Sequence, residues 1–485
     1  MGKYFTIAEM VKSETADRRG IDNRLPKALI CNVDALIDNV LDPLREAYGK
    51  PITVTSGYRC EALNKAVGGS KTSDHCFDDK TELLTSEGWK LFKDVSIGET
   101  IFSYSMERKK IELVPVESIT HYHHKGKMVK VVNKHVDLCV TDQHRMLVKY
   151  EEHKYKRKGT RNISASGQAY FDSLKTENDK FHIETASQIF GKRRIMMCSA
   201  KSDGYINMTD DDIKFLQLCM AVVADGFITY RNGRFSGVGF RLKRERKIKH
   251  TLELINSIGI YHTERISSDG VFTIWLNSTE AKPIFEVIGA EKIIPQWILM
   301  LSHFQIRGLI AEYAFYDGSY DKREGCDNFS ITSVNRKNVD TLQSMMAISG
   351  FRSSISIKPE NTYNIRNSTG VSKEAYIINV CDTQTSKVHE RRYSEVEYDG
   401  DVWCANNVNT TLIVRRNGKV SVQGNCNGMA ADIVGTPNTK AENKRLFNLV
   451  QELGLPFTQL IDEKNFSWVH VSYDSCNVKK QILKL

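Results

Sequence analysis

The sequence predicts a multi-domain protein in which an α+β domain is split by a long insert with a β-rich shell and a helical middle. Its 485 residues exceed the size of one ordinary domain. Helical patterns and an extended segment fill residues 1–75, and this style resumes only after residue 425. Between them, short β segments give way to long apolar helices and then return.

The elements follow in order along the chain. In the first outer segment, two stretches predict helices and "PITVTSGYR" predicts a strand; the helical stretches are "TIAEMVKSETADRRG" and "CNVDALIDNVLDPLREAYG". The insert opens with β segments such as "ETIFSYS" and "KMVKVVNKHVDLCVTDQHRMLVKY". Helices follow in "DDIKFLQLCMAVVADG", "IKHTLELINSIG" and "FQIRGLIAEYAFYDG", and strands return in "TLIVRRNGKVSVQGN". The last outer segment predicts a helix at "TKAENKRLFNLVQELG" and a strand at "FSWVHVSYD".

Composition excludes several classes. With 41% hydrophobic and 26% charged residues, the chain has the balance of a soluble globular protein. The start lacks a secretory apolar stretch and no segment reaches the roughly 18 apolar residues of a membrane span, so we expect synthesis in the cytoplasm and no membrane partner. We also expect a monomer. The 11 cysteines contain no CxxC pair, which favours free thiols over a disulfide framework or a zinc ribbon.

Charge is uneven along the chain. The outer segments carry a net charge of +2 and the insert a net charge of +7, out of a total of +9. This excess favours a polyanionic partner for the insert, although a run such as Arg241–Lys249 also fits a solvated face.

Removing residues 76–425 restores a short motif. The joined string "GGSKTSDH" and "CNGMAADIVG" places His75 seven residues before Asp432, in the order His-x-x-Gly-x-Ala-x-Asp. The motif has "SGYR" before it and "WVHVS" after it. Together these motifs resemble the M15 family of zinc D-alanyl-D-alanine carboxypeptidases, especially its short phage and bacterial forms. The resemblance covers nearly all of the 135 outer residues.

The resemblance implies a zinc peptidase acting on peptidoglycan stem peptides. His75, Asp432 and His470 match the Zn²⁺ ligands, and three such ligands leave a fourth position open for a water. Arg59 matches the arginine that holds a substrate carboxylate, as suits a guanidinium fork. Many relatives carry a general-base Glu where this chain has Ser467, so we assign that role to Glu463 ahead of Asp462.

Cys76 begins the insert, Asn425 ends it and Cys426 follows it. These ends resemble those of an intein, a self-splicing domain of the Hint type. The resemblance implies that the Cys76 thiol attacks the carbonyl of His75 and forms a thioester. Cys426 then takes the acyl group, Asn425 cyclises and breaks the chain before Cys426, and an S-to-N shift leaves a peptide bond between His75 and Cys426.

Other residues match supporting roles. Thr141 and His144 of "TDQH" match the pair that holds the junction and donates a proton to the scissile nitrogen. Cys404 of "VWC" stands where relatives have an Asp or Cys that assists proton transfer. Gly424 departs from the pattern, since most inteins have His there, so cyclisation is expected to be slower or to be helped from elsewhere.

Two apolar helices of the helical middle end in Asp-Gly, at Asp225 and Asp317. They resemble the paired motifs of LAGLIDADG (DOD-type) homing endonucleases that carry both in one chain. The resemblance implies that both acids bind Mg²⁺ at a double-stranded DNA site and that Lys292 matches an active-site lysine. Met220 and Glu312 stand where small residues usually let the helices touch, which leaves open whether cleavage is retained.

The expected organisation has five parts. Residues 1–75 and 426–485 form the peptidase, 76–200 and 386–425 form the splicing domain, and 201–385 form the endonuclease. We expect the spliced peptidase to reach the cell wall by phage lysis or virion delivery. Two alternatives stay open: a hedgehog-like protein that cleaves without ligating, which the Asn425 and Cys426 junction disfavours, and a non-catalytic cell-wall-binding protein, which Ser467 favours.

Overall fold

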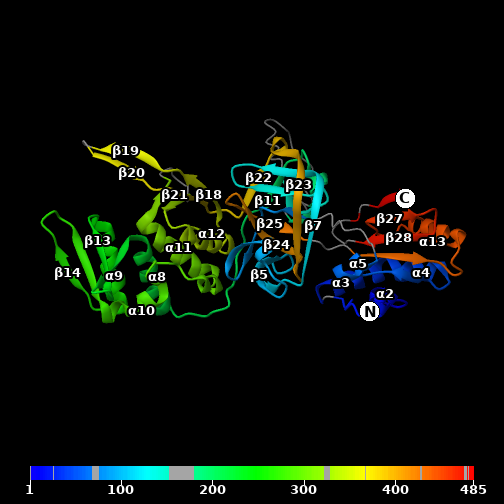
Figure 1. Ribbon diagram of the computed structural model, residues 1–485, viewed down its shortest axis with the longest axis horizontal. Helices are drawn as coiled ribbons and strands as arrows, with labels where there is room; N and C mark the ends of the chain where they lie inside the picture. Colours follow the sequence, from blue (N-terminus) through cyan, green and yellow to red (C-terminus); the bar gives the residue numbers. More distant parts are fainter. Residues whose placement is uncertain are drawn as a thin grey trace, which may run out of the picture.

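Three bodies lie in a row in the computed structural model (Figure 1). The structure describes residues 2–25, 27–67, 76–151, 180–321, 328–365, 368–425, 429–473, 478 and 480–484. Both chain ends lie in an outer body, a β-rich central body is in the middle, and a far body of helices and strands is at the other end. His75, Cys426 and Gly428 lie outside the described residues.

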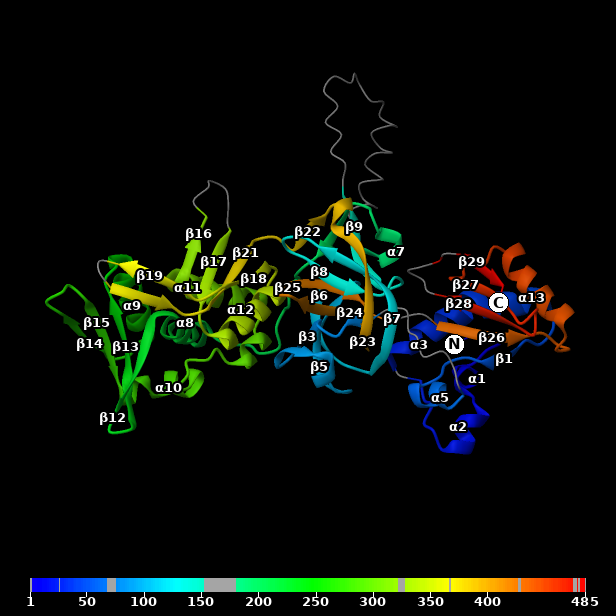
Figure 2. The ribbon, with the colours of Figure 1, turned by 45° about the horizontal axis from the view of Figure 1, so that its top comes forward.

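The outer body is one α+β domain built from both ends of the chain. Its sheet has the order β1-β26-β28-β27-β29. The strands are β1 (Thr53–Ser56), β26 (Met429–Val434), β27 (Gln459–Glu463), β28 (Trp468–Tyr473) and β29 (Gln481–Lys484). Strand β1 pairs antiparallel with β26, so segments more than 370 residues apart in the chain share one sheet (Figure 2). The two ends of the chain therefore form one sheet, and the strands between them in sequence belong to other sheets.

Helices complete the outer body, and the third and the last of them contact the middle strands of the sheet. They are α1 (Ile7–Val11), α2 (Glu14–Arg19), α3 (Lys27–Leu36), a π-helical turn (Ile37–Leu41), α4 (Asp42–Tyr48), α5 (Glu61–Ala66) and α13 (Lys440–Glu452). The core joins Leu36 and Leu41 of the first segment with Val469 and Val471 of the last. The first stretch expected to be one helix forms two short helices instead. The Ser13 side chain accepts a hydrogen bond from the Ala16 N–H and so caps a second helix that begins at Glu14.

The central body, Cys76–Met197 and Thr385–Asn425, is almost entirely β. Its first strands are β2 (Phe77–Asp78), β3 (Glu82–Thr85), β4 (Gly88–Leu91), β5 (Thr100–Ser105), β6 (Lys110–Pro115), β7 (Ser118–Val132), β8 (Asp137–Val140), β9 (Arg145–Tyr150), β10 (His182–Thr185) and β11 (Arg194–Met197). The later strands are β22 (Thr385–Val388), β23 (Tyr393–Asn406), β24 (Thr411–Arg416) and β25 (Lys419–Gly424). Strands β2, β23, β7 and β8 close into a barrel, and β7 and β23 form a long ribbon.

Local sequence explains the hairpin that leads to the end of the insert. Asn417 and Gly418 lie between β24 and β25, and both have positive φ, 48° and 71°. Asn-Gly is the residue pair that a two-residue hairpin with positive φ at both positions favours. The hairpin therefore fixes the register that carries β25 to Asn425.

The far body, Asp210–Cys381, repeats one topology twice. The first repeat contains α8 (Asp210–Asp225), β12 (Gly226–Arg231), β13 (Arg234–Leu242), α9 (Glu245–Ile258), β14 (Thr263–Ile266), β15 (Phe272–Asn277) and α10 (Ser278–Ile288). The second contains α11 (His303–Asp317), β16 (Gly318–Tyr320), β17 (Phe329–Ser333), α12 (Arg336–Ile348), β18 (Arg352–Lys358) and β21 (Ala375–Cys381), with a side ribbon of β19 (Asn361–Ile365) and β20 (Ser368–Ser372).

The strand orders make the repeat explicit. The orders β12-β13-β15-β14 and β16-β17-β21-β18 are equivalent, strand for strand. Helices α8 and α11 pack against each other between the two sheets, with apolar residues of both in one core (Figure 1). A two-repeat fold therefore follows from this chain's own topology.

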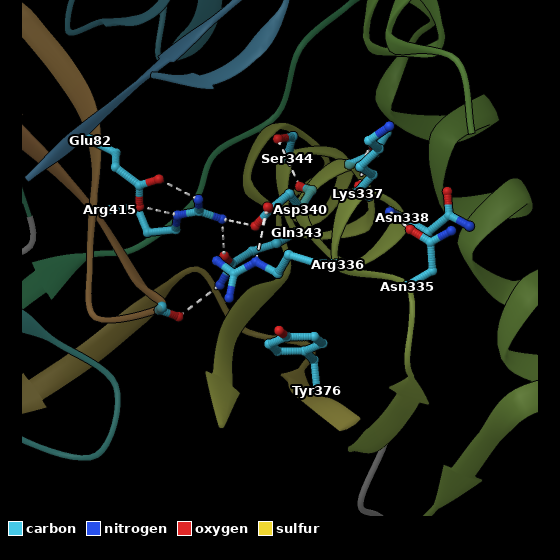
Figure 3. A network of polar contacts seen from close by, with 12 residues as sticks. Glu82, Asn335, Arg336, Lys337, Asn338, Asp340, Gln343, Ser344, Tyr376 and Arg415 are labelled. Carbon is cyan, nitrogen blue, oxygen red and sulfur yellow. Dashed lines mark hydrogen bonds and ion pairs between the residues drawn. The ribbon is translucent and has the colours of Figure 1, made fainter. Parts of the chain in front are cut away.

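A network of ion pairs joins the far body to the central body (Figure 3). The Arg415 guanidinium on β24 is 2% exposed and contacts Glu82 on β3 through two hydrogen bonds of 2.6 Å. It also donates to Asp340 of α12 at 2.5 Å and lies 4.7 Å from the centre of the Trp89 ring. Gln343 of α12 donates to the Gly418 carbonyl at 2.8 Å. One buried cation thus links two bodies.

We expect Arg415→Met to destabilise the chain by about 2–3 kcal/mol. Breaking a fully buried ion pair costs roughly 3–5 kcal/mol. The cost is expected to be lower here because the side chains of Glu82 and Asp340 are about a quarter exposed to solvent. The measurement is urea unfolding of the Cys76→Ala/Asn425→Ala chain followed by tryptophan fluorescence. Arg336→Met is the control, because its pair with Asp340 is 41% exposed on the arginine side and is expected to contribute less than about 1 kcal/mol. Equal effects of the two variants would contradict the assignment of Arg415 as the link.

Candidate functional sites

The start of the insert is fixed by Thr141. The buried Cys76 donates its backbone N–H to Thr141 Oγ1 at 2.9 Å, and the Thr141 N–H donates to the Cys76 carbonyl at 3.0 Å. Strand β2 pairs with β8 through Phe77 and Val140, which brings the two residues together. Thr141, the expected junction residue, therefore contacts the backbone of Cys76, the expected nucleophile.

His144 closes a tight turn beside this contact. Its N–H donates to the Thr141 carbonyl at 3.0 Å, and its fully buried ring lies 4.2 Å from the Phe77 ring. The N-terminus of α7 (Ala186–Ile189) holds the turn, since Ala186 donates to the His144 carbonyl at 2.9 Å. Hydrogen bonds thus hold both the N–H and the carbonyl of His144.

Cys404 lies on β23, the strand that pairs with the start of the insert. Strands β2 and β23 pair antiparallel, with Phe77 opposite Trp403. The same register extended by one residue puts Cys404 opposite Cys76, and side chains opposite one another in such a pair have Cβ atoms about 4.5–5.5 Å apart. Both thiols are fully buried. The structure thus brings together four expected residues of the insert's N-terminal junction.

The end of the insert reaches the same turn. Asn425 is fully buried, donates its N–H to the Thr410 carbonyl at 3.0 Å, and accepts a hydrogen bond on its own carbonyl from Arg145 Nη1 at 3.2 Å. Within the described part of the chain, its side-chain amide has no hydrogen-bond partner. Sequence reasoning missed Arg145; the signal was a charged residue directly after "TDQH", at the start of an apolar strand.

The outer body brings three expected peptidase residues together. Register pairs Ser56 with Asp432 and Asp432 with His470 across β1, β26 and β28. His470 Nδ1 lies 2.7 Å from Asp432 Oδ1, and Arg59 Nη2 lies 3.8 Å from Asp432 Oδ2. The imidazole and carboxylate are side chains of the type that holds zinc, so the residues present fit that metal. The third expected ligand, His75, lies outside the described residues.

Asn23 fixes the loop that carries Arg59. Its amide donates to the Tyr58 carbonyl at 3.1 Å and accepts from the Cys60 N–H at 2.7 Å, so it holds the backbone on both sides of Arg59. Asn23 is 8% exposed. Sequence reasoning missed this residue, because an isolated Asn in a polar loop gives no signal of its partners.

The sheet register separates Glu463 from Asp462. Ile461 lies opposite His470 and Glu463 opposite Trp468, so Glu463 belongs to the sheet face that carries His470. Asp462 alternates to the other face, where it is 5% exposed and accepts from the Phe466 N–H at 2.5 Å. Asp462 therefore has a structural role in the loop, and Glu463 stays the candidate base.

In the far body, Asp225 and Asp317 end the two packed helices α8 and α11. They line an open groove of about 730 Å³ together with Arg241, Lys243, Arg244 and Lys247. Burial, and then repulsion from Asp225, raises the pKa of Asp317 to about 6. Lys247 forms an ion pair with Asp225. Two acids that line one cationic groove are suited to a divalent cation and a phosphate backbone.

Lys292 lies next to these acids but bonds to backbone. Its ammonium donates to the carbonyls at the end of α8, at 2.7 Å to Gly226 and 3.3 Å to Val223. Burial lowers its pKa, while the charges of Asp317 and Asp225 act in the opposite direction. The lysine thus stabilises the helix end that presents Asp225.

The two unusual helix residues are both accommodated. Met220 is 1% exposed in the core. Glu312 is 6% exposed and pairs with His250 of α9 at 2.8 Å, which raises the pKa of that histidine. Glu312 therefore contacts α9, and helices α8 and α11 still pack together.

Comparison with known proteins adds one family match. The sequence profile of the family Peptidase M15 matches residues 3–91. The N-terminal region is peptidase M15-like. The match covers the first segment of the outer body and ends at β4 of the central body.

One curated relative aligns with most of the chain. Ribonucleoside-diphosphate reductase subunit beta of Aquifex aeolicus is 23% identical over 400 residues, which covers 77% of this chain and 53% of that protein. The chain thus spans about half the length of this relative. Since only 135 residues lie outside 76–425, most of the aligned residues belong to the insert.

Several solved structures are similar to part of the chain. I-DmoI in complex with DNA and Ca is 12% identical, with a TM-score of 0.26 over 36% of this chain and 84% of that one. The homing endonuclease I-WcaI bound to its DNA recognition sequence is 17% identical, with a TM-score of 0.22 over 37% and 78%. The N-terminal LAGLIDADG domain of DUF199/WhiA is 11% identical, with a TM-score of 0.21 over 35% and 78%.

Two further features are absent from the described residues. No helix among them is long and apolar enough to span a membrane. No group of three or more His, Cys, Asp or Glu side chains among them is arranged to hold a metal ion.

Asp317→Asn is expected to stabilise the chain at pH 7 by about 1–2 kcal/mol, after a discount for partial exposure. A carboxyl whose folded pKa is raised contributes stability below its unfolded pKa, near 4, and loses it as pH rises through about 6. The variant should therefore lose this pH dependence between pH 4 and 7. The measurement is the melting temperature of the Cys76→Ala/Asn425→Ala chain at several pH values.

Asp211→Asn is the control for this prediction, because Asp211 is an exposed carboxylate in the first turn of α8. Its pH profile should follow that of the parent chain. A lower melting temperature for Asp317→Asn than for the parent chain at pH 7 would contradict the raised pKa assigned to the Asp317 carboxyl.

Proposed function

We propose that residues 76–425 are an intein that excises itself and joins His75 to Cys426, which completes a zinc peptidase. One observation carries the proposal: the two outer segments share one sheet and core, while both ends of the insert meet at the Thr141–Arg145 turn. Excision of such an insert requires its two ends to be close, and ligation requires the two outer segments to be held together.

The proposed first step forms a thioester. The Cys76 thiol attacks the carbonyl carbon before it, a C–S bond forms, and the C–N bond to Cys76 breaks as the amide nitrogen takes a proton. His144 is the proposed donor of that proton, and Thr141 holds the Cys76 N–H. Cys404, opposite Cys76 in the extended register, is proposed to move a proton to or from the thiol.

The later steps transfer the acyl group and release the insert. The Cys426 thiol takes the acyl group from Cys76 by thioester exchange. The Asn425 amide nitrogen then attacks its own carbonyl carbon, which forms a cyclic imide and breaks the bond to Cys426. The freed amine of Cys426 attacks its own thioester and leaves a peptide bond. Each step needs only groups of the chain, with no oxidant or reductant.

The alignment with a ribonucleotide reductase subunit supports a separable insert. Most of the aligned residues lie within 76–425, although the relative's name has no connection with peptidases. A self-excising insert can interrupt functionally unrelated host proteins. Similar inserts are therefore expected in proteins whose names are unrelated. A hedgehog-like protein that cleaves without ligating has no use for Asn425 and Cys426, so we place it second.

The proposed product acts on peptidoglycan stem peptides. Asp432 and His470, with His75, would hold Zn²⁺, which would activate a water for attack on a peptide carbonyl. Arg59, 3.8 Å from Asp432, would hold a substrate carboxylate beside that centre. Glu463, on the sheet face of His470, would accept a proton from the water. A wall-binding protein without hydrolysis is the second candidate, because Ser467 stands in the usual place of the base.

The far body is the proposed DNA endonuclease. The repeated topology, the two acids at the ends of packed helices and the cationic groove support this role. Mg²⁺ bound by Asp225 and Asp317 would stabilise charge at the scissile phosphates. Arg241, Lys243 and Arg244 would neutralise the DNA backbone.

Splicing is tested through its thioester. Excess dithiothreitol added to the Asn425→Ala chain is expected to release residues 1–75, and Cys76→Ala/Asn425→Ala is expected to release nothing. Cys139→Ala in the Asn425→Ala background is the control, because burial raises the pKa of that thiol to about 11 and it takes no part. The measurement is the mass of the released fragment, and release that survives Cys76→Ala would contradict the assignment.

Peptidase activity is expected to rise on splicing. Asp432 and His470 are already paired in the unspliced chain, so the third ligand, His75, decides metal binding. We expect a directly expressed 135-residue fusion to bind one equivalent of zinc and to hydrolyse stem peptides. We expect the Cys76→Ala/Asn425→Ala chain to bind zinc with at least about tenfold lower affinity. Equal activity would contradict activation by splicing, and a zinc-loaded but inactive fusion would favour the wall-binding role.

DNA cleavage is tested with the uninterrupted peptidase gene. The excised insert is expected to make a Mg²⁺-dependent double-strand cut at the insertion point, and Asp225→Asn is expected to abolish it. Asp211→Asn on the same helix is the control and should cut normally. An insert that neither binds nor cuts this site has lost the activity.

A further inference from the structure

A second cavity lies where the far body joins the central body. It has a volume of about 350 Å³ and is lined mostly by polar residues. The second sheet of the far body forms one wall, with Tyr320, Phe329 and Arg352. The turn between β7 and β8 of the central body closes the cavity with Lys134 and His135. Both bodies therefore build this cavity, which contains neither of the two groove acids and no residue of the splicing centre.

Arg352 provides a buried donor in the wall. Its backbone N–H donates to the Thr383 carbonyl at 2.8 Å, and its Nη1 donates to the Thr385 carbonyl. These bonds fix the side chain but bring no negative charge to it. Within the described part of the chain, the Arg352 Nε is buried and has no hydrogen-bond partner. Because a buried donor without a partner costs free energy, this guanidinium favours an anion that accepts from it.

A preformed turn carries the second cation, Lys134. The Asn133 side-chain oxygen accepts from the His135 N–H at 2.7 Å, and its amide nitrogen donates to the backbone of β22 at 2.9 Å. Lys134 is exposed on this turn. Burial, and then the positive charges of Arg352 and of two lysines, lower the pKa of His135 to about 4. The cavity is therefore at a positive potential, and His135 is an uncharged imidazole at neutral pH.

One carboxylate also lines the cavity. Asp321 follows β16, and its N–H donates to the Asn328 carbonyl at 2.8 Å. Arg352 begins β18, which lies three strands from β16 in the sheet. Neighbouring strands are about 4.8 Å apart, so roughly 14 Å separates the two positions. The acid and the guanidinium are therefore at different ends of the cavity.

Strand β16 connects this cavity to the groove of the two acids. Asp317 and Gly318 line the groove, and the next two residues, Ser319 and Tyr320, line the cavity. Successive residues of a strand are about 3.4 Å apart, so the two spaces are neighbours. A DNA strand carries a phosphate about every 3.4 Å along the helix axis. DNA held at Asp317 would therefore bring backbone phosphates past Tyr320 toward the cavity.

We propose that Lys134 and Arg352 form a binding site for a phosphate group, with one cation from each body. The phosphate belongs either to a DNA backbone, which would add the central body to the DNA-binding surface, or to free inorganic phosphate. Either ligand would connect the two bodies, because its oxygens accept from both cations. The site is separate from the proposed endonuclease centre, and only DNA as its ligand rests on the proposed endonuclease function.

The first experiment titrates inorganic phosphate into the Cys76→Ala/Asn425→Ala chain by calorimetry. If free phosphate is the ligand, this parent should bind one equivalent, and Lys134→Ala and Arg352→Met should each weaken binding at least about tenfold. Lys125→Ala is the control, because this exposed lysine of β7 already pairs with Asp399 at 3.0 Å. The melting temperature of each variant is measured without ligand. Lys134 is exposed, so Lys134→Ala decides the result if Arg352→Met is destabilised.

The second experiment measures DNA binding by the same chains. The probe is a fluorescent duplex that spans the insertion point of the uninterrupted peptidase gene, and anisotropy gives the affinity at several salt concentrations. Each phosphate contact contributes about 0.9 to the slope of log affinity against log salt. If DNA is the ligand, Lys134→Ala and Arg352→Met should each lower the slope by about this amount, and Lys125→Ala should not change it.

The outcomes separate the site from the proposed endonuclease. Weakened binding in either experiment supports the site and identifies the source of its phosphate. Parent-like binding of both ligands by Lys134→Ala and Arg352→Met would overturn it, as would a parent that binds neither ligand. An equal loss in Lys125→Ala would also overturn it, because the effect would then reflect overall charge. A chain that binds phosphate here but no DNA would contradict the endonuclease and retain the site.

Discussion

The Thr141–Arg145 turn is the constraint on which the rest of the chain depends. Its first residue binds the backbone of Cys76 and its last binds the carbonyl of Asn425, so five residues hold both ends of a 350-residue insert. The N-terminus of α7 stabilises this turn, because the Ala186 N–H donates to the His144 carbonyl. With both ends fixed there, the outer segments leave the central body at adjacent points. They can then complete the sheet in which β1 pairs with β26.

The far body is structurally continuous with the central body. Arg415 joins β3 and β24 to α12 through Glu82 and Asp340, and β18 pairs with β25 at Ser354 and Lys419 (Figure 3). A single apolar core includes residues from both bodies. Removal of the far body would therefore expose apolar surface and leave a buried arginine without one of its partners. A shortened insert therefore needs a compensating change at Arg415, which would lose Asp340 as a partner.

The sequence predicted the arrangement where local pattern determines it. The β shell and the pair of apolar helices follow from periodicity, and the grouping of Asp432 with His470 follows from the resemblance to the M15 family. It could not identify Arg145, because the partner of a buried arginine depends on tertiary packing between β9 and β25. Glu312 looked unfavourable in sequence because its partner, His250, lies on another helix. The role of Asn23 was hidden for the same reason, since its bonds reach 35 residues along the chain.

The most direct test of the account is tandem mass spectrometry of a tryptic digest of the wild-type protein after expression. Ligation predicts one junction peptide, residues 72–75 joined to 426–440, with the sequence TSDHCNGMAADIVGTPNTK. It also predicts a separate insert that begins at Cys76 and ends at Asn425. Detection of this peptide would establish that the two outer segments become one chain. Intact peptides across both junctions, with no ligated peptide after long incubation under reducing conditions, would contradict it.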